Sequence, residues 1–522
     1  MTKAPAVKIA GAAALITVLT VVARLAGFGR TFVFLNTVGP TNLGDVYNAA
    51  NTIPNIVFEL VAGGALASLV VPLLAGAVAN GDRERVDAVS SALLTWVLVL
   101  LVPLAGLVAL LAGPIASLLD LPAAHQETAA SMLRVFAPQL PLYGVGIVLT
   151  GVLQAHHRFA WPVIAPLLSS VTVMGAYLSY AVIDGTKTGL GGLTRTGELF
   201  LSVGTTCGVV VLALCLFIPL RRLRLRLRPS LRFPGDEGRQ AVRLGWAGAV
   251  TVGSQQLITL AAIVLLTGDG DLSLYNAAQT VFLLPWAVLA VPVATAVYPS
   301  LSAAASRGDD EAYRQALSGT ARSVMLLAGL GVAVLIAVAG PAAFLIAAGP
   351  ASSGIVGFAP GLLGYALFAL LSRALYARGA TSAAAFSTAV GWVVAAGSAL
   401  ALTVLGDNRQ VLALSLANAI GMSVIGLLLV LAVRRHAGAA ALAGLGRTTL
   451  VTVLAAGLAA LAGWGVVAGL GGLFGPTPQV LGSIVQGILG GLAVLVVFVG
   501  VVYPLARHDL APLARRLRRR SA

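Results

Sequence analysis

The sequence contains few charged residues and almost no cysteine. Asp, Glu, Lys and Arg make up 10% of the 522 residues, whereas hydrophobic residues make up 58%. Soluble globular domains carry about 25% charged residues, so that class is excluded. Cys207 and Cys215 lie in one apolar stretch without the spacing of a disulfide or a metal site. We take both as small core residues and expect a polytopic membrane protein.

Motifs that carry catalysis are also missing. No GxxxxGK[ST] loop is present, so we expect no ATP hydrolysis by the chain itself. No Ser/His/Asp or zinc-ligand spacing appears, and no loop is long enough to form a soluble catalytic domain. The sequence therefore predicts a protein that is not an enzyme and that has no cofactor and no metal site.

Long hydrophobic runs make up most of the chain. About fourteen of them reach the length of roughly 20 residues that a helix needs to cross a bilayer. A polytopic all-α fold is therefore expected. The expected spans are residues 9–38, 46–78, 89–112, 129–154, 161–183, 198–220, 241–267, 273–301, 317–345, 356–377, 382–404, 411–433, 448–470 and 479–505.

The positive charges indicate how these spans are oriented. The net charge is +15. With both termini in the cytoplasm, about 25 of the 33 Lys and Arg residues fall on the cytoplasmic side, as the positive-inside rule expects. We therefore expect a multi-pass protein of the plasma membrane, and no nucleic-acid partner. The basic segment 221–240 and the basic C-terminal tail either contact anionic lipids or act only as topogenic charges.

The chain contains an internal repeat. Residues 47–52, YNAANT, return as residues 275–280, YNAAQT, and each copy leads to a charged loop. The offset is about 228 residues, and an even number of spans separates the copies, so both halves share one orientation. Parallel repeats are typical of transporters that bind substrate between the halves. The expected parts are an N-lobe at 1–220, a linker at 221–240, a C-lobe at 241–434 and two further helices with the tail at 435–522.

Polar side chains in the first two spans predict a wet chamber. Arg24 and Arg30 lie within the first apolar run, where a charge costs a few kcal/mol unless it faces a cavity or a partner. The next helix carries polar residues close to one face. These are Asp45, Asn48, Asn55 and Glu59, and the same helix also carries Asn51. We interpret the set as a positively charged chamber that receives an anion.

Further candidate residues lie in the second half. Asn276 and Gln279 occupy the repeat positions of two of these amides, and Gln255 lies in the seventh span. Arg373, near the inner end of the tenth span, either contacts the substrate or only orients its helix. The role of Glu59 has three alternatives, which are binding a coupling cation, binding a proton, and pairing with an arginine of the first span.

Several stretches resemble one transporter family. RLAGFGR…GDVYNAANTIPNIVFELVAGGALASLVVP resembles the first two helices of the MurJ (MviN) lipid II flippases. GVLQAHHRFAWPVIAP, YNAAQTVFLLPWAVLAVPVATAVYPSLSAAAS and LLSRALYARGAT resemble later segments of that family in the same order. These flippases belong to the multidrug/oligosaccharidyl-lipid/polysaccharide exporter superfamily. The resemblance implies two six-helix lobes around a cavity that opens alternately to each side, with helices 13 and 14 forming a groove for a prenyl tail.

The resemblance also implies a substrate and its contacts. The substrate would be lipid II, the undecaprenyl-pyrophosphate-linked precursor of peptidoglycan. Arg24 and Arg30 would hold its pyrophosphate, because arginine offers a bidentate fork to phosphate oxygens. Asp45 would pair with an arginine when the substrate is absent and then release it. Proteins of cell-wall synthesis would be partners.

The sequence departs from the family pattern at the cavity. Phe58 and Glu59 stand where relatives have two arginines, and Gly63 stands where they have an acid. Gln279 and Thr280 replace an Asp-Arg pair. Three alternatives therefore stay open. One is a cation-coupled exporter or another polysaccharide-lipid flippase of the superfamily, the second is a membrane enzyme acting on prenyl lipids, and the third is a non-transporting scaffold.

Overall fold

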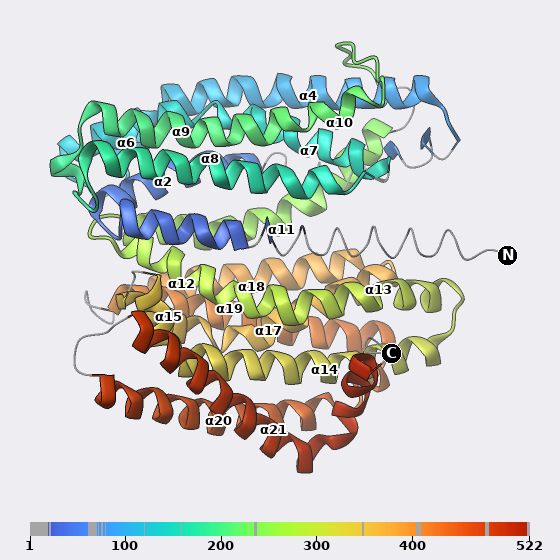
Figure 1. The fold of residues 1–522 in the computed structure, drawn as a ribbon. Helices are drawn as coiled ribbons and strands as arrows, with labels where there is room; N and C mark the ends of the chain where they lie inside the picture. The colour runs from blue at the N-terminus through green and yellow to red at the C-terminus, as the bar shows by residue number, and fades with distance from the viewer. Residues whose placement is uncertain are drawn as a thin grey trace. The chain divides into compact units, whose positions relative to one another are not determined.

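The fold is given by a computed structural model (Figure 1). It describes residues 19–518 except 20, 21, 24, 61–69, 71–72, 75–76, 79, 120, 157, 234–236, 347–348, 403–408 and 475–479, and it leaves the side chains at 124, 237–249, 472–474 and 506–518 undescribed. Two positions of interest, Arg24 and Gly63, lie outside the described residues. Every regular element among the described residues is a helix.

The chain forms two compact units. The first comprises Met1–Thr259 and Ile263–Ser273. A helix over 25–37 opens the described part of this unit. The further helices of the unit are α2 (Asn42–Phe58), α4 (Arg83–Leu110), α5 (Ala112–Ser117), α6 (Ala123–Phe136), α7 (Gln139–Ala155), α8 (Ala160–Asp184), η2 (Leu190–Gly192), α9 (Arg195–Cys215), α10 (Phe217–Arg221) and α11 (Glu237–Leu266).

The second unit comprises Leu260–Ala262 and Leu274–Ala522. In it α20 and α21 lie side by side (Figure 1). Its helices are α12 (Asp271–Pro285), η3 (Trp286–Ala290), α13 (Val291–Ser306), α14 (Asp310–Ala337), α15 (Ala339–Leu345), η4 (Gly349–Ala351), α16 (Ser352–Phe358), α17 (Gly361–Ala377), α18 (Thr381–Leu402), α19 (Gln410–Ala437), η7 (Ala439–Leu442), α20 (Leu445–Phe474) and α21 (Val480–Arg518).

The described helices confirm a polytopic all-α protein. Ten of the helical segments among the described residues are long and apolar enough to cross a membrane, and the pair α16–α17, bent by 55°, adds an eleventh. These correspond to the expected spans 3–6 and 8–14. Expected spans 1, 2 and 7 include residues that are not described, so the total of fourteen stays a prediction.

Matched contacts in the two units support the internal repeat. The hydroxyl of Tyr47 on α2 lies 2.7 Å from the hydroxyl of Thr205 on α9. At the repeat position, the hydroxyl of Tyr275 on α12 accepts a hydrogen bond from Asn418 on α19 at 2.8 Å. Helices α9 and α19 are the sixth and twelfth expected spans. In each half, a tyrosine therefore joins equivalent helices, α2 to α9 in one and α12 to α19 in the other.

The charged loops of the repeat also share their geometry. Asp82 begins α4 as N-cap and accepts from the backbone amide three residues later at 3.0 Å, and Asp309 does the same for α14 at 3.0 Å. A glycine with φ 68° precedes each cap, Gly81 in one copy and Gly308 in the other. Glycine adopts this left-handed conformation at little cost. The two copies of the loop therefore form the same type of turn.

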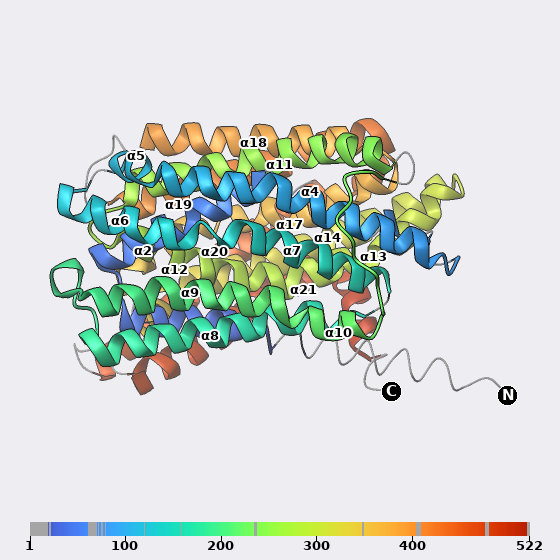
Figure 2. The same ribbon diagram turned by 90° about the horizontal axis from the view of Figure 1, so that it is seen from above.

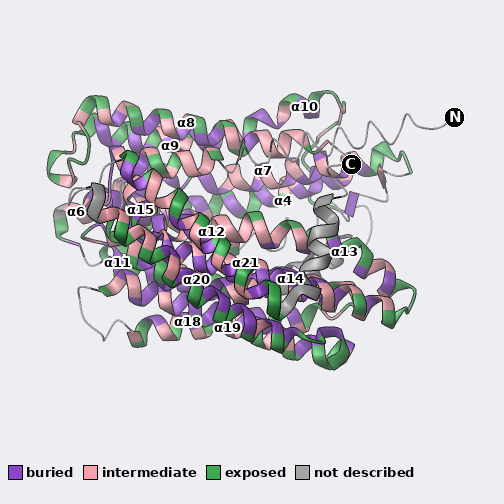
Figure 3. Ribbon diagram, turned by 60° about the horizontal axis from the view of Figure 1, so that its bottom comes forward, coloured by how far each residue is buried: buried purple, intermediate pink, exposed green. Residues whose placement is uncertain are grey.

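Many helices have exposed outward faces (Figure 3), and many of the exposed side chains are large and apolar, as contact with lipid requires. On α4, for example, the inward residues Val89, Leu93 and Val97 are buried in an apolar core. The outward residues of the same helix are exposed, and they include Leu98, Val99, Leu100 and Val102. Only a hydrocarbon environment lets such a surface form without a large hydrophobic cost.

The basic linker lies across α4 as an extended strap (Figure 2). The backbone amides of Arg228 and Ser230 donate to the hydroxyls of Ser91 and Thr95, each at 3.0 Å. Leucines and arginines alternate along the strap, so the leucines pack on the core and the arginines face away. The exposed arginines are Arg221, Arg222, Arg224, Arg226, Arg228 and Arg232.

The division between the two units does not fall at this linker. Most of α11 and the first turn of α12 count with the first unit, whereas the sequence placed residues from 241 onward in a second lobe. The first turn of α12 is held by hydrogen bonds to Asp45 on α2. The lobes at 1–220 and 241–434, with the additional part at 435–522, stay a prediction.

Candidate functional site

Helix α2 is fixed in the first unit through one face. Its N-cap, Thr41, accepts a hydrogen bond from the amide of Gly44 at 3.2 Å. Tyr47 is buried, and its hydroxyl lies 2.9 Å from that of Tyr177 on α8 as well as close to Thr205. These contacts set the rotation of α2 about its axis. They therefore decide which side chains the adjoining face presents.

The adjoining face carries the predicted polar residues. Asn48, Asn51, Asn55 and Glu59 are only half-buried, while most of the residues between them are buried. Asn55 donates from Nδ2 to the backbone oxygen of Asn51 at 3.2 Å. The side-chain oxygen of Asn51 is buried and has no hydrogen-bond partner among the described residues. Leaving such an acceptor unsatisfied costs about 1–3 kcal/mol, so this oxygen favours a donor group on a ligand or a water.

Asp45 is completely buried at the start of this helix. Its Oδ2 accepts from the backbone amides of Gly268, Gly270 and Leu272 at 3.2, 2.8 and 3.4 Å. Its Oδ1 accepts from the amide and the hydroxyl of Ser273, each at 2.8 Å. A carboxylate at a helix N-terminus is stabilised by the free amides and the helix dipole. We call this arrangement, formed by Asp45 and residues 268–273, the Asp45 clamp.

The clamp corrects the expected role of Asp45. We predicted that this carboxylate would pair with an arginine, but in the structure both of its oxygens are occupied by the turn and first turn of α12. The physical reason is that five donors, four backbone amides and one hydroxyl, already satisfy both carboxylate oxygens. The structure therefore gives Asp45 the role of joining α2 to α12.

The offset of the internal repeat could have pointed to this contact. Ser273 lies 228 residues after Asp45, which is the offset of the internal repeat. The two residues therefore occupy equivalent positions, and the structure brings them together. Asn48 adds a bond from its Nδ2 to the Ser273 hydroxyl at 3.0 Å. Gly270 fits here because its φ is 98° and a Cβ would lie 2.5 Å from the backbone oxygen of Pro40.

Arg30 is exposed on the helix over 25–37. Its side chain forms no ion pair or hydrogen bond with another described residue. Its charge interacts electrostatically with the buried phenols of Tyr143 on α7 and Tyr177 on α8. The guanidinium donors of Arg30 are therefore open to an anionic ligand. Arg24 lies outside the described residues, so its expected place beside Arg30 stays a prediction.

Glu59 ends α2 in a half-buried position. Its backbone amide bonds to the oxygens of Asn55 and Ile56. The carboxylate of Glu59 makes no ion pair with any described residue, and Arg30 is among those residues. Neighbouring Phe58 is buried, with its ring centroid 5.4 Å from that of Tyr143. Phe58, which departs from the family pattern, is therefore part of the apolar core. For Glu59, three roles stay open, which are cation binding, proton binding and pairing with Arg24.

The remaining candidates lie elsewhere in the two units. Gln255 is exposed on α11, and Asn276 and Gln279 are half-buried on α12. Arg373 on α17 is half-buried and donates to the backbone oxygen of Ala369 in the same helix. A bond within one helix tests neither alternative for Arg373, so both stay predictions. Convergence of these residues with α2 on one chamber stays a prediction.

Comparisons with known proteins agree on one family. The family model described as the lipid II flippase MurJ matches residues 34–476. A relative from Burkholderia cenocepacia, named lipid II flippase MurJ, is 28% identical over 324 residues. That alignment covers 60% of this chain and 61% of the relative, so it spans less than two thirds of the relative's length.

Solved structures show the same fold. A structure named lipid II flippase MurJ, in an inward closed conformation, matches with a TM-score of 0.71 and 17% identity over 94% of this chain and 99% of that chain. An inward-facing multidrug resistance MATE family transporter of the MOP superfamily matches with a TM-score of 0.62 and 16% identity, over 81% and 94% of the two chains. Since the family model spans most of the sequence, this chain is an integral membrane protein that belongs to the MurJ family of lipid II flippases.

Proposed function

We propose that this protein moves lipid II from the inner to the outer leaflet of the plasma membrane by alternating access. The observation that carries the proposal is the family match over residues 34–476. The repeated tyrosine contacts and charged loops support it, because parallel repeats are typical of transporters with the substrate site between the halves. The protein changes no covalent bond of its substrate and needs no cofactor.

The pyrophosphate of the substrate is bound by Arg24 and Arg30. A guanidinium fork matches phosphate oxygens in a bidentate geometry, and the donors of Arg30 have no partner among the described residues. The amides on the polar face of α2 supply neutral hydrogen bonds beside this charge. Additional contacts from other helices are Gln255, Asn276, Gln279 and Arg373.

The orientation of the protein follows from its positive charges. In the second unit, the loops expected in the cytoplasm lie together, since Arg378 pairs with Asp310 at 2.6 Å and Arg314 donates to the oxygen of Ala437 at 3.1 Å. We place this end, and both termini, in the cytoplasm. The exposed arginines of the strap across α4 then contact anionic headgroups of the inner leaflet. Contact with proteins of cell-wall synthesis stays a prediction.

Depletion of the protein in its own cells tests the proposed substrate. We expect lipid II to accumulate on the inner leaflet, and the purified protein to flip lipid II in proteoliposomes. Accumulation of a different prenyl-linked saccharide would identify another polysaccharide-lipid flippase instead. If no prenyl-linked precursor accumulates, the scaffold alternative replaces the proposal.

Replacing Glu59 by glutamine tests coupling to an ion gradient. The change removes the charge but keeps the size, so a carboxylate that carries a coupling cation or proton would lose that role. We expect flipping by Glu59→Gln to become insensitive to ionophores that collapse the gradient across proteoliposomes. Glu127→Gln on α6, where the side chain is exposed, is the matched control. An ionophore response equal to that of the wild type would remove Glu59 from coupling.

A further inference from the structure

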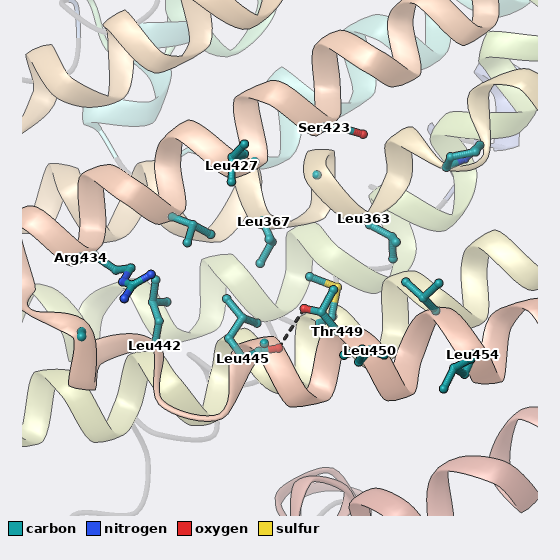
Figure 4. Close-up of a pocket in the computed structure, with 18 residues that line it drawn as sticks. Leu363, Leu367, Ser423, Leu427, Arg434, Leu442, Leu445, Thr449, Leu450 and Leu454 are labelled. Carbon is teal, nitrogen blue, oxygen red and sulfur yellow. Dashed lines mark hydrogen bonds between the residues drawn. The ribbon is translucent and has the colours of Figure 1, made fainter.

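An apolar groove of about 810 Å³ lies in the second unit between α17, α19 and α20 (Figure 4). This volume is within the range of about 300–1,000 Å³ typical of small-molecule sites. Most of its wall is leucine, valine and other apolar side chains. Examples from the three helices are Leu363, Leu367, Leu427, Leu450 and Leu454. No residue of α21 lines it, so it differs from the groove expected between helices 13 and 14.

The polar side chains within the wall are already satisfied. The hydroxyl of Ser423 donates to the oxygen of Ala419 at 2.7 Å, and that of Thr449 donates to the oxygen of Leu445 at 2.8 Å. Neither hydroxyl needs a partner from a ligand. The middle of the groove therefore favours a hydrocarbon chain.

One end of the groove is positively charged. Arg434 lies there on α19, beside Leu442 (Figure 4). It is exposed, and its guanidinium has no hydrogen-bond or ion-pair partner among the described residues. Leu445 and Gly446, the first residues of the 30-residue helix α20, line the same end. The amides and dipole at a helix N-terminus favour an anion, as does the guanidinium.

This charged end is held in place by two other arginines. From α14, Arg314 donates to the oxygen of Ala437 at 3.1 Å and Arg322 donates to the oxygen of Ala443 at 2.7 Å. These two bonds bracket η7, which closes the end of the groove. The site is therefore preformed, with the guanidinium of Arg434 left for a ligand.

The length of the groove matches one leaflet of a bilayer. Its wall on α19 runs from Ser423 to Arg434, which is roughly 16 Å at the helical rise of 1.5 Å per residue. The hydrocarbon core of a bilayer is about 30 Å thick, so the groove extends from the interface to about the midplane. A single acyl chain fits this depth, whereas a polyprenyl chain is much longer.

We propose that this groove binds an anionic phospholipid of the adjacent leaflet. One acyl chain lies between α20 and the pair α17–α19, and the phosphate lies at Arg434 and the first turn of α20. The bound lipid fills the space between α20 and the helices of the second lobe. This site is independent of the transport substrate, so the failure of either proposal leaves the other standing.

Native mass spectrometry of the purified full chain tests the proposal with two lipids of equal chain length. We expect the wild type to retain dioleoyl phosphatidylglycerol about tenfold more tightly than dioleoyl phosphatidylcholine. Arg434→Gln should weaken the tightest phosphatidylglycerol binding by roughly ten- to a hundredfold, as expected for loss of a charged hydrogen bond. Arg435→Gln is the matched control, because Arg435 is exposed on the same helix but does not line the groove.

A second variant fills the groove without removing charge. Gly446 lines the groove and a Cβ there meets open space, so Gly446→Leu should displace the lipid without a clash. Gly457→Leu on the same helix also meets open space, lies outside the groove and should bind lipid as the wild type does. Equal retention of the two phospholipids, or wild-type binding by Arg434→Gln and Gly446→Leu, would overturn the proposal. The proposal would also be overturned if the wild type retained a polyprenyl phosphate more tightly than the phospholipids and Gly446→Leu abolished that binding.

Discussion

The Asp45→Asn variant is expected to lose about 3 kcal/mol of stability, together with most of its transport. Asparagine keeps one acceptor oxygen, but its amide group turns donors toward the backbone amides of residues 268–273. Several of the five hydrogen bonds of the Asp45 clamp are then lost, and buried N–H groups are left unsatisfied. The thermal unfolding midpoint of the purified protein and lipid II flipping in proteoliposomes measure the two effects.

Asp82→Asn is the matched control for this change. Asp82 is also an N-terminal cap, but it is exposed and accepts a single amide at 3.0 Å. Asparagine caps helices about as well as aspartate, so little change is expected. Equal shifts in the unfolding midpoint for Asp45→Asn and Asp82→Asn would show that the Asp45 clamp adds no stability of its own.

Replacing Arg30 by alanine is expected to reduce flipping by at least ten- to a hundredfold while the protein still inserts and folds. The pyrophosphate loses a charge-assisted, bidentate contact worth about 1.5–3 kcal/mol, and each 1.4 kcal/mol corresponds to a factor of ten. Folding should be unaffected because Arg30 is exposed and makes no bond to another described residue. The same loss is expected for Arg24→Ala. Lipid II flipping and complementation of a flippase-depleted strain are the measurements.

Two further variants separate charge from geometry. Arg30→Lys keeps the charge but lacks the planar fork, so an intermediate rate is expected. Arg195→Ala removes an arginine whose side chain is 66% exposed and which pairs with Glu198 at 2.9 Å, and it should flip lipid II normally. Complementation by Arg30→Ala at the wild-type level would contradict the assigned role.

The membrane class, the helical fold and the repeat could all be predicted from the sequence. Each rests on local properties, namely the length of an apolar run and the recurrence of a short motif. The two charged turns illustrate this, because a glycine followed by a capping aspartate forms the same structure at 81–82 and 308–309. A local signal is sufficient wherever the neighbours along the chain decide the conformation.

Parts of the candidate site could not be predicted in this way. The polar face of α2 follows from helical spacing, and its amides and Glu59 are half-buried, whereas Asp45 is completely buried. The partner of Asp45 did not follow, since its donors come from residues more than 220 positions away. A buried carboxylate binds whichever donors the packing brings close, and sequence spacing does not report distances across the fold.

The sequence by itself therefore determined the class of protein and most of its crossing helices, and it predicts the residues that would hold an anion. Only the tertiary structure decided that Asp45 caps α12, that leucines 223, 225 and 227 hold the linker against the core near α4, and that Arg434 lies at one end of an apolar groove. The reason is that helix formation is governed by hydrophobic length and local hydrogen bonds. The partner of a polar side chain is set instead by which helices pack together.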